Sequence, residues 1–128
     1  MYSHITLGTN DLDKATEFYD ATLKTLGFAR TLTMLEHGLV AYGPPRQPAQ
    51  LFICLPYDGK AATVGNGTHV ALLAPDRRSV DAFHAAVLAA GGADEGAPGP
   101  RPDYHEHYYG AYVRDLDGNK LQACCHTS

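Results

Sequence analysis

The feature that most constrains this 128-residue chain is an internal repeat. The segment THVALLAPD (68–76) repeats the pattern of SHITLGTND (3–11), because each has a histidine second, a leucine fifth and an aspartate last. The same register continues without a gap beyond these segments. The identical pairs are His4–His69, Leu7–Leu72, Asp11–Asp76, Phe18–Phe83, Ala21–Ala86, Leu23–Leu88 and Gly27–Gly92. Such self-similarity predicts two copies of one structural unit.

Each copy predicts a strand followed by a helix. Residues 4–8 and 69–73 alternate in the way a half-buried strand does. Asn10 and Asp76 then offer side-chain oxygens that can cap a helix N-terminus. The aligned glycines at the end of the repeat are predicted to stop both helices. The apolar side chains in between follow a helical stripe: Leu12, Ala15, Phe18, Tyr19, Leu23 and Leu26 in the first copy, and Val80, Phe83, Val87 and Leu88 in the second.

Shorter strand signals follow each predicted helix. They cover residues 28–34, 39–42, 50–55, 93–95, 108–114 and 120–125, with a hairpin turn at Asp117-Gly118 and a Pro-rich connection at 97–103. We therefore expect one α+β domain over residues 1–128, made of module 1 (1–56), a linker (57–67) and module 2 (68–126). Neither module can bury a sheet face alone. Two βαβββ modules are expected to form one curved, cup-shaped mixed sheet with the helices on its outer face.

Composition excludes several partners. The net charge is −4 and the ten Lys and Arg residues are scattered, so no surface for nucleic acid is predicted. No apolar run reaches the roughly 20 residues that span a bilayer, and the N-terminus lacks the features of a signal peptide. The three cysteines have neither disulfide-framework nor zinc spacing, which favours a reducing, cytoplasmic setting. The expected partner is a small molecule.

Strand alternation places one ligand-type side chain on each of four strands. His4, Gln50, His69 and Gln122 point away from the aliphatic side chains of their strands. Two imidazoles and two amide oxygens suit a divalent first-row metal such as Zn, Ni, Fe, Mn or Co. The alternative is that these side chains are hydrogen-bonded or exposed and have no ligand.

Polar and aromatic side chains are concentrated in YHEHYY, residues 104–109. His107 and Glu106 are candidates for an acid or base at the mouth of the cup. Phe52, Tyr109 and Tyr112 are candidates for the wall of an apolar pocket. The alternatives are an ordinary surface loop for the first pair and core packing for the aromatic residues.

The chain resembles the vicinal oxygen chelate superfamily of glyoxalases, bleomycin-resistance proteins and extradiol dioxygenases. The resemblance rests on NGTHVAL (66–72), YYGAYVRD (108–115) and DLDGNKLQACCH (115–126), and on the two modules. It implies a divalent metal held by two ligands from each module, which would be His4 with Gln50 and His69 with Gln122. It also implies a homodimer and lyase or isomerase chemistry, with dioxygenase-like chemistry less favoured.

The sequence departs from the family pattern at Gln122. The last strand of the family typically reads DPDGNKIE, and its glutamate is a metal ligand and, in glyoxalase I, the proton shuttle. An amide offers a carbonyl oxygen but carries no charge and moves no proton near neutral pH. Standard glyoxalase I chemistry is therefore not expected. The alternative function is metal-independent binding of a small molecule, as in bleomycin-resistance proteins, at a degenerate metal site.

Overall fold

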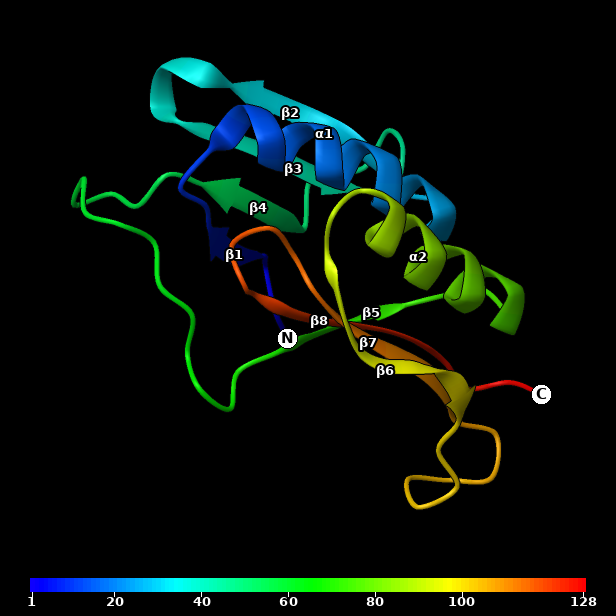
Figure 1. The fold of residues 1–128 in the computed structure, drawn as a ribbon. Helices are drawn as coiled ribbons and strands as arrows, with labels where there is room; N and C mark the ends of the chain where they lie inside the picture. Colours follow the sequence, from blue (N-terminus) through cyan, green and yellow to red (C-terminus); the bar gives the residue numbers. More distant parts are fainter.

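The computed structural model describes residues 1–128 and contains two βαβββ modules (Figure 1), which confirms the predicted fold class. The first comprises β1 (Ile5–Gly8), α1 (Leu12–Leu23) with a 3₁₀ turn (Lys24–Leu26), β2 (Ala29–Met34), a second 3₁₀ turn (Leu35–His37), β3 (Leu39–Gly43) and β4 (Leu51–Cys54). The second comprises β5 (Val70–Leu73), α2 (Arg77–Ala89), β6 (Ala93–Pro100), β7 (Tyr109–Arg114) and β8 (Lys120–Cys125). Neither α1 nor α2 is long and apolar enough to cross a membrane.

Each module has one four-stranded sheet with the same topology. The strand orders are β1-β4-β3-β2 and β5-β8-β7-β6, and the first pair of each sheet is parallel. In register, Thr6 lies beside Phe52 in the first sheet, and Ala71 lies beside Gln122 in the second. β1 and β5 are edge strands and do not pair with each other, so the chain contains two separate sheets. One side of β1 and one side of β5 have no neighbouring strand.

The two modules share one core. The helices lie side by side on the same side of the molecule (Figure 1), and 18 buried residues from both modules form a single cluster. Phe18 and Tyr19 of α1 and Phe83 of α2 are at most 2% exposed. The aliphatic positions of the strands face this cluster, so the other face of each sheet is free to carry polar side chains.

Two local predictions need correction. Asp11, not Asn10, caps α1, because its carboxylate accepts from the backbone N–H of Lys14 at 3.1 Å. Asn10 instead accepts from the backbone N–H of Ala62 in the linker. The strand predicted at 93–95 extends to Pro100, because β6 is an edge strand with an irregular register, where proline removes no necessary hydrogen bond.

A hairpin of the second module is fastened to the first module. The turn between β7 and β8, residues 115–119, contacts the junction of β1 and α1. Asp117 accepts from the Thr9 hydroxyl at 2.6 Å and from the backbone N–H of Asn10 at 2.8 Å. Asn119 donates to the Gly8 carbonyl at 2.9 Å. The motif DGN therefore joins the two modules as well as making a turn.

Candidate functional site

The candidate site lies on the face of the second sheet that points away from the helices. Alternate residues of β5, β7 and β8 belong to the core cluster, so the residues between them face outward. We call this surface the open face of the second sheet. Its side chains are His69, Ala71, Leu73, Tyr112, Arg114, Lys120, Gln122 and Cys124.

Gln122 is the most deeply buried polar group on the open face. The residue is 2% exposed, and its Nε2 donates to the Tyr108 hydroxyl at 2.5 Å. Gly110 makes this contact possible: a Cβ at that position would lie 3.0 Å from Gln122 Nε2 and 3.3 Å from Tyr108 Cε1. The absence of a side chain at Gly110 thus leaves room for the Gln122–Tyr108 pair.

Tyrosine side chains cover part of the open face. The rings of Tyr104 and Tyr108 meet edge to face with centroids 4.9 Å apart. Burial, helped by the neighbouring Cys124 thiol, raises the pKa of Tyr108 to about 12. Burial and the neighbouring Tyr104 hydroxyl raise the pKa of Tyr112 to about 12 as well. Both phenols are therefore neutral near pH 7 and can donate a hydrogen bond to a ligand.

The structure places His4 and His69 at equivalent positions but in separate surroundings. Each immediately precedes an edge strand, β1 or β5, and each is exposed. The His4 ring lies 4.8 Å from Phe52, and its Nδ1 is 2.8 Å from the Ser3 hydroxyl. The His69 ring lies 5.8 Å from Tyr112. Nowhere do three or more His, Cys, Asp or Glu side chains gather in an arrangement suited to a metal ion.

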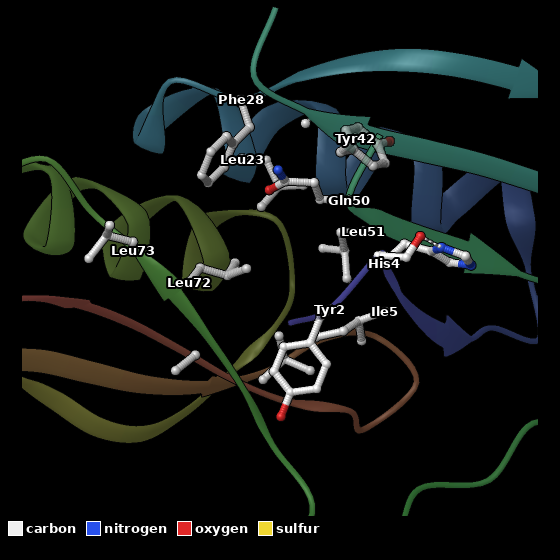
Figure 2. Close-up of a pocket in the computed structure, with 14 residues that line it drawn as sticks. Tyr2, His4, Ile5, Leu23, Phe28, Tyr42, Gln50, Leu51, Leu72 and Leu73 are labelled. Carbon is white, nitrogen blue, oxygen red and sulfur yellow. Dashed lines mark hydrogen bonds between the residues drawn. The ribbon is translucent and has the colours of Figure 1, made fainter. Parts of the chain in front are cut away.

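Gln50 borders a cavity between the two modules. The cavity has a volume of about 350 Å³ and lies between the chain start, β4 and β5. Figure 2 shows the carboxamide of Gln50 directed toward Leu23 and Phe28, while the His4 imidazole points to the other side. The structure does not bring these two predicted ligands together.

Strand register identifies a different counterpart for Gln122 in the first sheet. Phe52 lies beside Thr6 of β1 as Gln122 lies beside Ala71 of β5, and Thr6 is aligned with Ala71 in the repeat. The first module thus has an aromatic ring where the second has an amide. Two imidazoles and one or two amides leave a dication without any carboxylate, so this donor set does not fit a charge-neutralised divalent centre.

The other predicted site residues are also dispersed. Glu106 and His107 contact each other at 3.0 Å, and their side chains are 83% and 50% exposed. Tyr109 points to the helix side, where its hydroxyl donates to Asp81 of α2 at 2.6 Å. Phe52 and Tyr112 lie on different sheets. The structure therefore does not assemble Phe52, Tyr109 and Tyr112 into one pocket wall.

Three residues of this region were not among the sequence-predicted site residues: Tyr108, Lys120 and Arg101. Strand alternation in the sequence could have identified Tyr108, because residues 108, 110 and 112 lie on one face of the strand and Tyr109 lies on the opposite face. Alternation likewise places Lys120 on the same face of β8 as Gln122. Nothing in the sequence indicated Arg101, whose position depends on how the Pro-rich connection folds back.

The paired modules and their open polar faces define the class: a two-module α+β protein with ligand-type side chains on the sheet face opposite the helices. A family model described as Glyoxalase/Bleomycin resistance protein/Dioxygenase superfamily matches residues 2–123. The chain belongs to this superfamily. A search of curated proteins found no match.

Solved structures agree with this assignment. A glyoxalase/bleomycin resistance protein from Albidiferax ferrireducens T118 is 40% identical, with 98% of each chain covered and a TM-score of 0.85. A lactoylglutathione lyase from Agrobacterium tumefaciens is 23% identical, with 98% and 92% covered and a TM-score of 0.66. The fosfomycin resistance protein FosX from Listeria monocytogenes is 18% identical, with 99% and 93% covered and a TM-score of 0.69. The last two show the shared fold alone.

Proposed function

We propose that this protein binds a small oxygen-rich molecule on the open face of the second sheet, without a metal ion. The observation that carries the proposal is the state of Gln122. Its amide is buried and hydrogen-bonded to Tyr108, and Phe52 takes the equivalent position in the first sheet. Neither Gln122 nor Phe52 supplies the carboxylate that would neutralise a dication. Neutral phenols and an amide instead provide hydrogen-bonding groups beside apolar surface, as ligand sites usually do.

The test uses probes that the relatives' names suggest: fosfomycin, bleomycin and S-lactoylglutathione. The protein is purified without a chelating tag, labelled with ¹⁵N and titrated before and after EDTA treatment. We expect one of these probes to shift the backbone amides of Tyr112, Gln122 and Cys124 equally with and without EDTA. Tyr108→Phe should weaken this binding, and Tyr57→Phe, at a fully exposed tyrosine, should not. Loss of binding after EDTA would contradict the proposal.

A second candidate is a metal-dependent enzyme with lyase or isomerase chemistry. What favours it is the placement of His4 and His69 immediately before the two free edge strands. Its ligands would be His4, His69, Gln122 and Gln50, and its acid or base Glu106 or His107. Zn, Ni, Fe, Mn or Co bound in a one-to-one ratio, and lost in both His4→Ala and His69→Ala, would support this candidate. Protein that binds none of these ions would contradict it.

We also propose that two chains associate through the free edges. Hydrogen-bonding groups of β1 and β5 are unpaired on one side, and an exposed edge is a ready surface for association. Leu73 on β5 is 62% exposed and Tyr2 before β1 is 76% exposed, so apolar area accompanies the free edges. A homodimer would cover this area and enclose the open faces. Light scattering coupled to gel filtration measures the mass directly.

A further inference from the structure

We propose that the ligand of the open face carries an oxyanion, a carboxylate or a phosphoryl-type group, that binds Lys120 and Arg101. This inference rests on the proposed function and names the chemical class of its ligand. It starts from the charges around Tyr112. The Lys120 Nζ lies 5.2 Å from the centroid of the Tyr112 ring, and the Arg101 Cζ lies 5.9 Å from it.

Neither cation has an acidic partner. The ion pairs of the molecule join Arg30 to Asp20, His84 to Asp94, His107 to Glu106 and Arg114 to Glu95. Arg114 is paired with Lys120 in the β7–β8 register, and it has its counter-charge. Lys120 and Arg101 do not. The chain as a whole is acidic, with a net charge of −4, but the surroundings of the Tyr112 ring carry two half-buried cations without a counter-charge.

Arg101 is held in place for this role. Its guanidinium donates to the carbonyls of Ala97, Gly99 and Pro100 at 2.8, 2.9 and 3.3 Å. Gly99 approaches so closely that a Cβ there would lie 3.2 Å from Arg101 Nη1. These carbonyls orient the side chain but leave its full positive charge. Orientation before binding lowers the entropy lost when a ligand binds.

The surroundings add hydrogen-bond donors suited to an anion. Tyr112, Tyr104 and Tyr108 are phenols of one neighbourhood, and the pKa of Tyr112 and of Tyr108 is raised to about 12, so these two hydroxyls keep their protons. The His69 ring, just before β5, lies 5.8 Å from the Tyr112 ring on β7. The groups acting on the Tyr112 phenol are Tyr104, Arg101 and Cys124, and none of them is a carboxylate. Two cations and neutral hydrogen-bond donors suit an oxyanion, and the Glu95 carboxylate on the neighbouring strand β6 is already paired with Arg114.

The experiment is an NMR titration of ¹⁵N-labelled protein with inorganic phosphate and, in a separate arm, with acetate. Ionic strength is held constant with sodium chloride, because salt weakens exposed charge interactions. We expect one of the two anions to shift the amides of Tyr112, Lys120 and Gln122. The arm that binds distinguishes a phosphoryl-type from a carboxylate ligand. Failure of both anions to shift these amides would overturn the inference.

Variants test the two cations directly. Lys120→Gln and Arg101→Gln should each weaken anion binding about tenfold, the usual scale for a charge-assisted hydrogen bond, whereas Lys120→Arg should retain it. Lys60→Gln and Arg78→Gln remove the same charge at exposed positions away from the open face and should change nothing. Binding as tight in Lys120→Gln as in the unmodified protein would overturn the inference.

The proposed function and this inference fail in different ways. If an uncharged diol such as ethylene glycol shifts the open-face amides and neither anion does, the ligand site stands and the oxyanion is wrong. If neither the diol nor any anion shifts them, and the three larger probes also fail, the proposed function falls with it.

Discussion

Tyr19 of α1 donates a hydrogen bond of 2.5 Å to the Asp115 carboxylate, which belongs to the other module. Both residues are buried, with 1% and 6% of their surfaces exposed. Asp115 also accepts from the backbone N–H groups of Asp117 and Asn119, so it fixes the hairpin that joins the modules. One buried carboxylate thus holds the turn of the second module against the helix of the first.

Replacing Tyr19 with phenylalanine should lower the free energy of unfolding by about 1–3 kcal/mol, since a buried carboxylate loses a hydrogen bond and the ring volume stays almost unchanged. Urea denaturation followed by circular dichroism measures the change. Tyr57→Phe is the control, because Tyr57 is fully exposed and donates no side-chain hydrogen bond. Equal stability of Tyr19→Phe and the unmodified protein would show that the Tyr19–Asp115 bond contributes nothing.

Carboxylates at the equivalent positions Phe52 and Gln122 should create a metal site. Phe52→Glu combined with Gln122→Glu puts one acid at each equivalent position, and we expect at least tenfold tighter Zn²⁺ or Ni²⁺ binding by isothermal titration calorimetry. Gln50→Glu with Gln122→Glu is the matched comparison. Stronger binding in the Gln50 variant would show that Gln50, and not Phe52, is the counterpart of Gln122.

Stability should fall in alkaline solution through the open-face phenols. The pKa of Tyr108 is about 12 in the folded protein, against about 10 in an unfolded chain. Its contribution is therefore complete below pH 10 and is lost as the pH rises from about 10 toward about 12. Urea unfolding across this range should show a smaller loss for Tyr108→Phe. An identical loss in both proteins would contradict the environment described for Tyr108.

A charge on the free edge should weaken the proposed homodimer. Leu73→Lys introduces a cation at a 62% exposed position of β5 and should shift the measured mass toward that of one chain. Leu88→Lys, at a 42% exposed position of α2, should leave association unchanged. A dimer that tolerates Leu73→Lys and is lost in Leu88→Lys would place the interface on the helices.

The repeat allowed the fold to be predicted, because alternation and helical spacing recur in both halves. The residue that caps α1 was harder to predict, because the side chains of Asn10 and Asp11 can both accept a hydrogen bond at a helix N-terminus. The folded position of the linker decides between them, since Asn10 accepts from the backbone N–H of Ala62 instead. The site was predicted less well. Strand alternation is enough to place Tyr109 and Tyr112 on opposite faces of β7. The approach of Arg101 to Tyr112 depends on how residues 97–101 fold, and their sequence has no periodic pattern that predicts it.

The contact between the hairpin and the β1–α1 junction is one-sided. Thr9 and Asn10 donate to Asp117, and the residues aligned with them in the second half are Ala74 and Pro75. Alanine has no hydroxyl and proline has no backbone N–H. A chain built from two first halves would lack the hairpin, and a chain built from two second halves would lack its donors. The halves are alike in shape, yet they are no longer interchangeable.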